Sequence, residues 1–117
     1  MRKKLSPQYL YAGVYMIRNE RNGKVYIGSS CDIENRLSMH RSLLARGKHG
    51  CKDLQMDYDL HHPFTAHVLY VEAVPRDSRT HNRTKLYAME WKFIQKYNAI
   101  ENGYNSMPIN ELCLKAL

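Results

Sequence analysis

Residues 13–28 constrain the fold more than any other stretch of this chain. They read GVYMIRNERNGKVYIG, two short apolar runs on either side of a polar turn that contains Asn22 and Gly23. Asn-Gly between such runs is the strongest short-range signal of a β-hairpin, although this connection is longer than two residues. We therefore expect strands at about 12–18 and 24–29. Four apolar side chains in them suit a pleated, half-buried surface: Val14, Ile17, Val25 and Ile27.

The period of two along a strand divides these side chains between two faces. Tyr15 and Ile17 share one face of the first strand, and Tyr26 and Gly28 share a face of the second. If the register brings these faces together, Tyr15 and Tyr26 lie side by side with open space at Gly28. Paired tyrosines are also common as plain core or edge residues of sheets, so the pair alone does not define a function.

A helix should follow the hairpin. Ser30 or Asp32 can cap its first turn, and Gly47 is a natural stop. Arg36 and His40 are four residues apart, so their side chains point the same way. The predicted apolar stripe of this helix is Ile33, Leu37 and Leu44.

The second half of the chain predicts a short helix, a strand and a longer helix. The short helix covers 51–61 and the strand 65–72; the last helix begins within 79–85 and ends near 97. The packing residues expected in the short helix are Leu54, Tyr58 and Leu60. One face of the strand should carry Ala66, Val68 and Tyr70. The apolar stripe expected on the last helix is Leu86, Met89, Phe93 and Tyr97. Asp53 and Asp57 are expected on a solvated acidic face.

Length and charge limit the class of protein. The 117 residues fit one domain, 1–117. Residues 1–50 hold ten Lys/Arg against three Asp/Glu, whereas residues 51–117 are balanced, so the whole net charge of +7 lies in the hairpin half. A localised basic excess favours a polyanion such as nucleic acid. The start of the chain lacks the apolar core of a secretory signal and no run is long enough to span a membrane, so we expect a cytoplasmic protein without a membrane partner.

The hairpin motifs resemble the signature of the GIY-YIG nuclease family. Gly13-Val14-Tyr15 stands where the family has Gly-Ile-Tyr, and Tyr26-Ile27-Gly28 matches outright. The resemblance covers about residues 11–106. It implies a small α/β (α+β) domain, with a three-stranded antiparallel sheet flanked by helices.

The resemblance also implies a catalytic set: Tyr15, Tyr26, Arg36, His40, Glu90 and Asn105. Glu90 would be the metal ligand, Arg36 would bind the phosphate, Tyr26 and Asn105 would position the site, and Tyr15 would be the general base with His40 assisting. His40 has the more suitable unperturbed pKa, so the residues themselves leave the choice of base open. His49 resembles a second histidine of some family members.

The expected reaction is hydrolysis of DNA phosphodiester bonds to 5′-phosphate products. Mg²⁺ is the expected cofactor, with Mn²⁺ as a substitute, because one carboxylate plus waters suits it. Arg36 and Lys24 would help to lower the pKa of Tyr15, and Gly28 would leave room beside it. Arg41, Arg46 and Lys48 are expected to contact DNA. A homodimer, or a separate specificity domain or protein, would complete the enzyme, whether the chain is a catalytic domain from a longer protein or stands alone.

Two alternatives remain at this stage. Cys31, His40, His49 and Cys51 are ligand types that could build a structural zinc site, although zinc modules usually bring their ligands in close pairs. A third cysteine, Cys113, makes the number odd, which favours free thiols. The chain could also be a basic module that binds nucleic acid without cutting it, but such a module has no use for Glu90 on its basic face.

Overall fold

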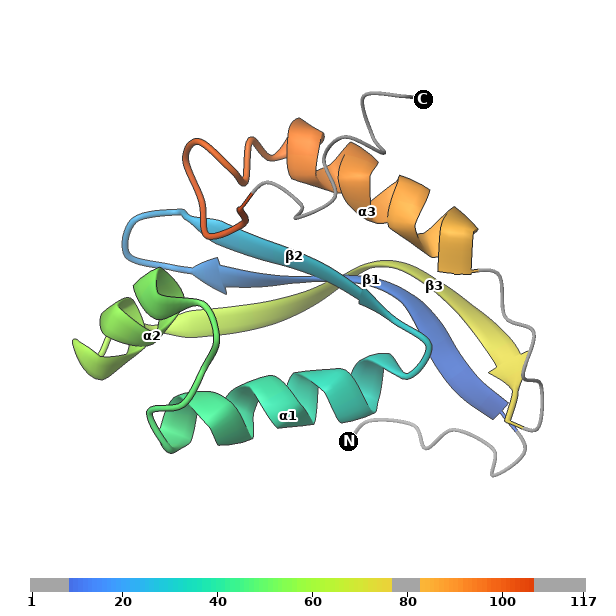
Figure 1. Cartoon of the computed structure of the whole chain (residues 1–117), viewed down its shortest axis with the longest axis horizontal. Helices are drawn as coiled ribbons and strands as arrows, with labels where there is room; N and C mark the ends of the chain where they lie inside the picture. Colours follow the sequence, from blue (N-terminus) through green and yellow to red (C-terminus); the bar gives the residue numbers. More distant parts are fainter. Residues whose placement is uncertain (1–8, 77–82, 107–117) are drawn as a thin grey trace.

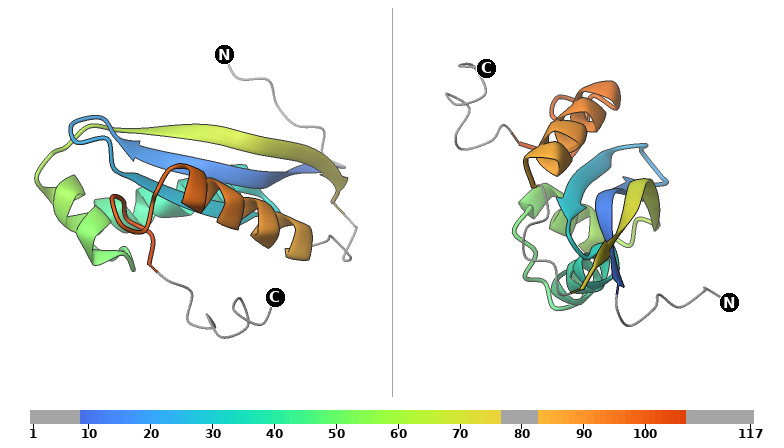
Figure 2. Two further views of the ribbon diagram at one scale, coloured as in Figure 1. Left: turned by 90° about the horizontal axis from the view of Figure 1, so that it is seen from above. Right: turned by 90° about the vertical axis from the view of Figure 1, so that its right-hand side faces the viewer.

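The computed structural model describes residues 9–76 and 83–106. Six elements follow one another: β1 (Tyr9–Asn19), β2 (Val25–Ser30), α1 (Ile33–Ala45), α2 (Lys52–Asp59), β3 (Phe64–Pro75) and α3 (Arg83–Lys96). The strands form one antiparallel sheet in the order β2-β1-β3. Figures 1 and 2 show α1 and α3 on opposite faces of this sheet, with α2 beside the hairpin turn. The predicted three-stranded α+β fold is confirmed.

The alternation along β1 builds two cores. On one face, Tyr15 and Ile17 pack with Ile33 of α1. On the other, Val14 and Met16 pack with Ile94 of α3 among others. The two-face prediction for the first strand is therefore confirmed, although β1 begins earlier than expected, at Tyr9. Its first residues pair with the end of β3, which also extends beyond the predicted 65–72.

A bulge in β3 changes one prediction. Tyr15 pairs with Val68 and Val14 pairs with Tyr70, so Leu69 has no partner opposite it and the alternation shifts by one residue. Tyr70 consequently joins the core beneath α3. The expectation that it shares a face with Ala66 and Val68 was wrong, because a period of two cannot anticipate an extra residue.

The helix ends obey local rules. Asp32 caps α1 by accepting a hydrogen bond from the Asn35 backbone N–H at 3.2 Å. Gly47 ends the helix with a positive φ of 69°, and the following N–H of Lys48 bonds back to the carbonyl of Leu43. This left-handed closure is the reason a glycine stands there. The predicted cap and stop of the first helix are both confirmed.

The apolar stripes of the other helices were only partly right. In α2, Leu54 is fully buried, but Leu60 lies beyond the helix end and is 59% exposed, and Tyr58 is also exposed. A helix of two turns offers the core too narrow a face for all three. In α3 the buried residues are Leu86 and Ile94, while Tyr97 lies past the helix end and is exposed. The prediction that Leu60 packs was wrong, whereas Tyr58 and Tyr97 contact the rings of Phe64 and Phe93 but stay outside the buried core.

A buried asparagine joins three segments that are far apart in sequence. The side-chain oxygen of Asn19 accepts from the backbone N–H of Arg21, and its amide nitrogen donates to Tyr104 Oη at 2.9 Å and contacts His62 Nδ1 at 2.8 Å. Tyr104 Oη in turn donates to Asp57 of α2, which holds the pKa of that carboxyl below its usual value. Asp57 therefore belongs to this network rather than to the solvated acidic face predicted for it.

Among residues 9–76 and 83–106, no helix is long and apolar enough to cross a membrane. Within these same ranges, Cys31 and Cys51 form no disulfide. Cys113 lies outside the described residues, as do the first positions proposed for the start of the last helix.

Asn19 should be a major determinant of stability. Asn19→Leu keeps the volume but removes every hydrogen bond of the amide, so His62 Nδ1 and a turn N–H lose this partner and Tyr104 Oη keeps only Asp57. We expect the free energy of unfolding to fall by about 3 kcal/mol, because each lost partner is costly when buried. Urea denaturation measures it. Asn35→Leu on the exposed face of α1 is the control, expected within about 0.5 kcal/mol of the parent; equal midpoints for the two variants would contradict the role of Asn19.

Candidate active site

The centre of the site is the contact between Tyr15 and Gly28. These residues pair across the hairpin, and the Tyr15 ring lies on the glycine. A Cβ at position 28 would stand 2.5 Å from Tyr15 Cζ and even closer to its hydroxyl. The space beside Gly28 is therefore filled by Tyr15 itself, not left open as predicted. Only glycine admits the ring at this position.

Tyr15 and Tyr26 both face His40 of α1. Each tyrosine ring makes an edge contact with the imidazole at a centroid distance of 5.4 Å. Tyr15 Oη lies 2.7 Å from His40 Nε2, and the other ring nitrogen, Nδ1, lies 2.7 Å from His49 Nε2. The structure thus joins Tyr15, His40 and His49 in one line of hydrogen bonds.

Burial keeps these groups neutral. Desolvation raises the pKa values of both tyrosine hydroxyls above their usual range. Burial, helped by the neighbouring His49 and the charge of Arg36, lowers the pKa of His40 to about 4. The pKa of His49 is also lowered, mainly by burial and then by Arg36. Arg36 opposes the effect on Tyr15, since its hydrogen bond and charge act to lower that pKa.

Glu90 reaches the same strand from the other face of the sheet. It projects from α3 and accepts a hydrogen bond from the Ser29 hydroxyl of β2. Burial raises the pKa of Glu90, and the Ser29 bond partly offsets this. Its negative charge raises the pKa values of Tyr15 and Tyr26, so the three groups act on one another across the outer edge of β2.

A loop after α3 closes that edge. The Tyr104 backbone N–H donates to the Val25 carbonyl at 2.9 Å. The Asn105 side chain then pairs twice with Ile27, accepting from its N–H at 2.8 Å and donating to its carbonyl at 2.9 Å. Asn105 therefore takes the place of a neighbouring strand and fixes the backbone between Tyr26 and Gly28.

A cavity of about 630 Å³ opens beside this edge. Its lining residues come from β2, α3, the start of α2 and the closing loop, and include Tyr26, Glu90, Asn105 and Lys52. A carboxylate on the wall of a solvent-filled cavity is a hard oxygen donor with room for waters around a cation, which suits Mg²⁺. The residues present therefore fit a divalent ion held by Glu90.

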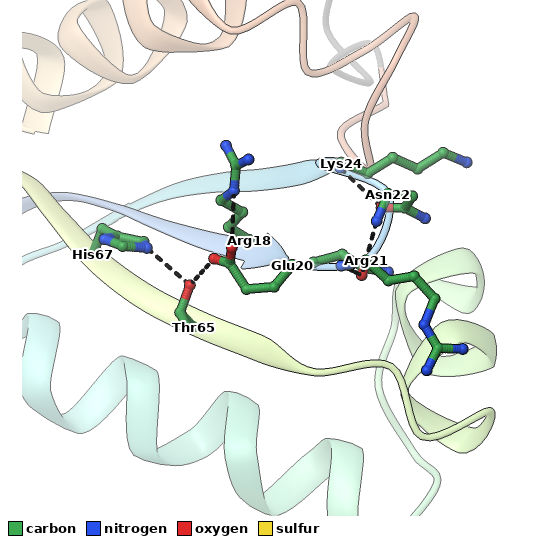
Figure 3. Close-up of polar contacts among 8 residues, drawn as sticks. Arg18, Glu20, Arg21, Asn22, Lys24, Thr65 and His67 are labelled. Atoms are coloured by element: carbon green, nitrogen blue, oxygen red, sulfur yellow. Dashed lines mark hydrogen bonds and ion pairs between the residues drawn. The ribbon is translucent and has the colours of Figure 1, made fainter.

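The remaining predicted residues are spread over the surface. Lys24 lies at the hairpin turn, where its backbone N–H donates to Asn22 Oδ1 at 2.9 Å (Figure 3). Its ammonium stands over the Tyr104 ring, four strand positions from the glycine opposite Tyr15, so it is not placed to lower that tyrosine's pKa as expected. Arg41, Arg46 and Lys48 are exposed at the C-terminal half of α1 and in the loop after it.

The zinc alternative is wrong. Within residues 9–76 and 83–106, no three His, Cys, Asp or Glu side chains come together to hold a metal. Both ring nitrogens of His40 are taken by hydrogen bonds, and the Cys51 thiol points to the Tyr104 carbonyl at 3.4 Å.

Sequence reasoning missed two residues that support the site. Ser29, which holds Glu90, directly follows the second motif, so its position was a usable signal. Gln55 is buried in α2; its oxygen accepts from the His49 N–H at 3.0 Å and its nitrogen donates to the Leu44 carbonyl. Nothing in a short polar helix distinguishes such a glutamine beforehand.

The neutral His40 should make the fold acid-sensitive. Its pKa is about 4 when folded and near 6.5 in the unfolded chain, so between these values the unfolded state binds more protons. The stability contributed by His40 is complete above about pH 6.5 and is lost as the pH falls toward 4, by at most about 3 kcal/mol.

We expect the unfolding free energy of the parent to fall more steeply from pH 7 to pH 4.5 than that of His40→Gln, which cannot titrate there. Urea denaturation at several pH values measures both slopes, and their difference removes the contribution of carboxylates. His67→Gln, at an exposed position, should keep the parent slope. Parallel curves for the parent and His40→Gln would show that His40 is not held neutral.

Comparisons with known proteins agree with this geometry. The family model described as the GIY-YIG catalytic domain matches residues 11–105. Intron-associated endonuclease 1 of Enterobacteria phage T4 is 33% identical over 95 residues, which are 80% of this chain and 36% of that protein. The chain therefore spans about a third of this relative's length.

Solved structures give the same result. The catalytic domain of the intron endonuclease I-TevI, in a mutant form, superposes with a TM-score of 0.69 and 31% identity, covering 82% of this chain and 93% of that one. Another structure of the catalytic domain of homing endonuclease I-TevI gives a TM-score of 0.62 and 29% identity, over 80% and 96% of the two chains. The motifs, the fold and these matches show that the chain belongs to the GIY-YIG catalytic domain family.

Proposed function

We propose that this domain hydrolyses DNA phosphodiester bonds in a Mg²⁺-dependent reaction that leaves 5′-phosphate ends. The observation that carries the proposal is that Glu90, from one face of the sheet, and Tyr26, from the other, line one cavity at the edge of β2, while Tyr15 packs on Gly28 of the same strand. Nuclease members of this family generally use a divalent metal, and Mg²⁺ is our choice among such ions.

Each residue has a role that its contacts support. Tyr15 is the general base, and His40, in hydrogen-bond contact with its hydroxyl, assists. Arg36 binds a non-bridging phosphate oxygen with its planar guanidinium. Tyr26 positions the substrate from the cavity wall, and Asn105 holds the strand that carries it.

Glu90 is the proposed metal ligand. Ser29 donates to one of its oxygens and so orients the carboxylate toward the cavity. When bound, a divalent cation supplies charge that stabilises the departing 3′ oxygen. Mg²⁺ keeps much of its hydration when it binds to a protein, so the other oxygen of Glu90 would be a sufficient protein ligand for it.

The basic side chains around α1 are the proposed DNA surface. Arg36, Arg41, Arg46 and Lys48 are exposed on α1 and the following loop. Contacts of Lys and Arg with phosphates release counterions, which gives sequence-independent, salt-sensitive binding. Arg41 also lines an apolar cavity of about 470 Å³ together with Leu37 and Leu44.

Duplex cleavage requires two cuts, one in each strand. One active site attacks one strand at a time, so a homodimer or two successive visits would be needed to cut both. We propose that target choice lies in a separate specificity domain or protein, and that the domain acts on DNA in the cytoplasm. Its relatives include an intron-associated endonuclease and a homing endonuclease, so a homing role is the leading candidate for its biology.

Glu90→Gln should separate cutting from binding. The substitution keeps the hydrogen bond to Ser29 but removes the charge that holds a cation, so we expect cleavage of supercoiled plasmid in Mg²⁺ to fall at least about a hundredfold. DNA binding should be retained or improved, because a negative charge near phosphate is lost. Gel assays with Mg²⁺, Mn²⁺ and EDTA measure cutting, and the ratio of nicked to linear product reports whether one or both strands are cut.

Glu34→Gln, at an exposed position in the first turn of α1, is the matched control and should cut like the parent. Cutting that survives Glu90→Gln would refute the metal site while leaving a nuclease. Salt-sensitive binding without any cutting by the parent would favour the non-catalytic binding module instead.

The basic surface makes a separate, ionic prediction. Replacing Arg46 and Lys48 together with Gln should weaken binding to all DNA sequences alike and reduce the salt slope of log K by about 2. Fluorescence anisotropy across a salt series measures this slope. Lys96→Gln at the end of α3 is the control, because its ammonium packs over Tyr97 away from α1; a slope unchanged in the double variant would place DNA elsewhere.

A further inference from the structure

The structure fixes which nitrogen of each histidine carries its proton. We propose that His49 is a positioning residue that makes His40 a hydrogen-bond donor to Tyr15, and that the Cys51 backbone N–H at the start of α2 imposes this arrangement. The inference rests on the proposed function, in which Tyr15 is the base. It defines how His40 assists.

The first step is at Cys51. Its backbone N–H donates to His49 Nδ1 at 3.0 Å. A backbone N–H can only donate, so His49 Nδ1 must present a lone pair. A neutral imidazole then carries its hydrogen on Nε2. The His49 backbone is itself held in place, because its N–H donates to the buried Gln55.

The second step is between the two histidines. His49 Nε2 lies 2.7 Å from His40 Nδ1, and the ring planes are within 23° of parallel with centroids 4.9 Å apart. At this centroid distance, so short an N–N contact joins ring edges rather than ring faces. Since His49 supplies the hydrogen, His40 Nδ1 is the acceptor, and the hydrogen of a neutral His40 is on Nε2.

The third step reaches Tyr15. His40 Nε2–H lies 2.7 Å from Tyr15 Oη, so the phenol oxygen accepts. The reverse direction would need a hydrogen on His49 Nδ1, which would face the Cys51 N–H. A doubly protonated His40 would likewise set its Nδ1–H against His49 Nε2–H. Burial and the charge of Arg36 oppose both charged forms.

The direction of this chain determines the chemistry of Tyr15. Its oxygen receives a hydrogen bond from His40, and the Arg36 side chain acts to lower its pKa, so both groups favour a phenolate. Burial, Tyr26 and Glu90 act against ionisation. Because His40 Nε2 already carries a hydrogen, it cannot take the proton of Tyr15. The hydroxyl hydrogen therefore points away from His40 and must leave to solvent before Tyr15 can accept a proton from the attacking water; the His40 donor then stabilises the phenolate that remains.

Tautomers can be read directly. Two-dimensional ¹H–¹⁵N spectra of the histidine rings distinguish protonated from bare nitrogens, independently of cutting. At neutral pH, in the full chain, we expect His40 and His49 both to be neutral and protonated on Nε2. Protonation of either ring on Nδ1 would overturn the proposal, even in an active nuclease. Conversely, the expected tautomers in a protein that cuts no DNA would leave this inference standing and defeat the proposed function.

A matched pair of variants tests the role of His49. In His49→Gln the side-chain amide can still donate toward His40 Nδ1, whereas His49→Leu fills similar space without a donor. We expect His49→Gln to cut plasmid at least about tenfold faster than His49→Leu, a usual effect of losing the partner that orients a catalytic histidine.

The ¹H–¹⁵N spectra of the same two variants should also differ. The His40 ring should stay protonated on Nε2 in His49→Gln, and an Nδ1-protonated population should appear in His49→Leu. Urea midpoints identify any loss of folding, and rates are compared only well below them. Equal cutting by the two variants, or an unchanged His40 tautomer in His49→Leu, would show that His49 does not set the direction of the chain.

Discussion

The contact of the Tyr15 ring with the backbone of Gly28 is the constraint on which the site depends. The ring lies on the partner strand because nothing stands above the glycine. This places the hydroxyl at one fixed point below α1, where His40 and Arg36 can reach it from the same helix face. The two motifs of the sequence signature are thus joined by one contact, because Tyr15 of the first packs on Gly28 of the second.

The elements around this contact are joined by polar side chains as much as by apolar packing. Asn105 pairs with the free edge of β2 as a strand would, and Asn19 ties the hairpin turn to α2 and to Tyr104. A domain of this size buries little apolar surface, so these hydrogen bonds add to the packing that fixes the segments relative to one another. The loop with His49 is fixed in the same way, by Gln55, so the geometry of the site rests on amides remote from the reaction.

The candidate site residues came from the family resemblance and not from the pattern of the residues. Sequence reasoning predicted the hairpin and the first helix cap because these depend on local rules: a turn dipeptide, a period of two, an Asp before a helix. It failed where tertiary contacts decide. Three features have no signal in the hydrophobic periodicity of the sequence: the bulge in β3 that moves Tyr70 to the other face, the burial of Ile94 rather than Tyr97 at the end of α3, and the burial of Asn19. Lys24 was placed near Tyr15 on charge alone, but the register puts it at the far end of the strand.

The electrostatics of the site explain why its groups must act together. Burial raises the pKa values of Tyr15, Tyr26 and Glu90 and lowers those of both histidines, so every one of these environments favours the uncharged form. Arg36 is the protein's own opposing charge, and it acts on both tyrosines. A phenol in such surroundings ionises only if donors already point at its oxygen when charge develops, since reorganising them would add to the barrier. The fixed direction of the two histidines meets this requirement before any substrate arrives.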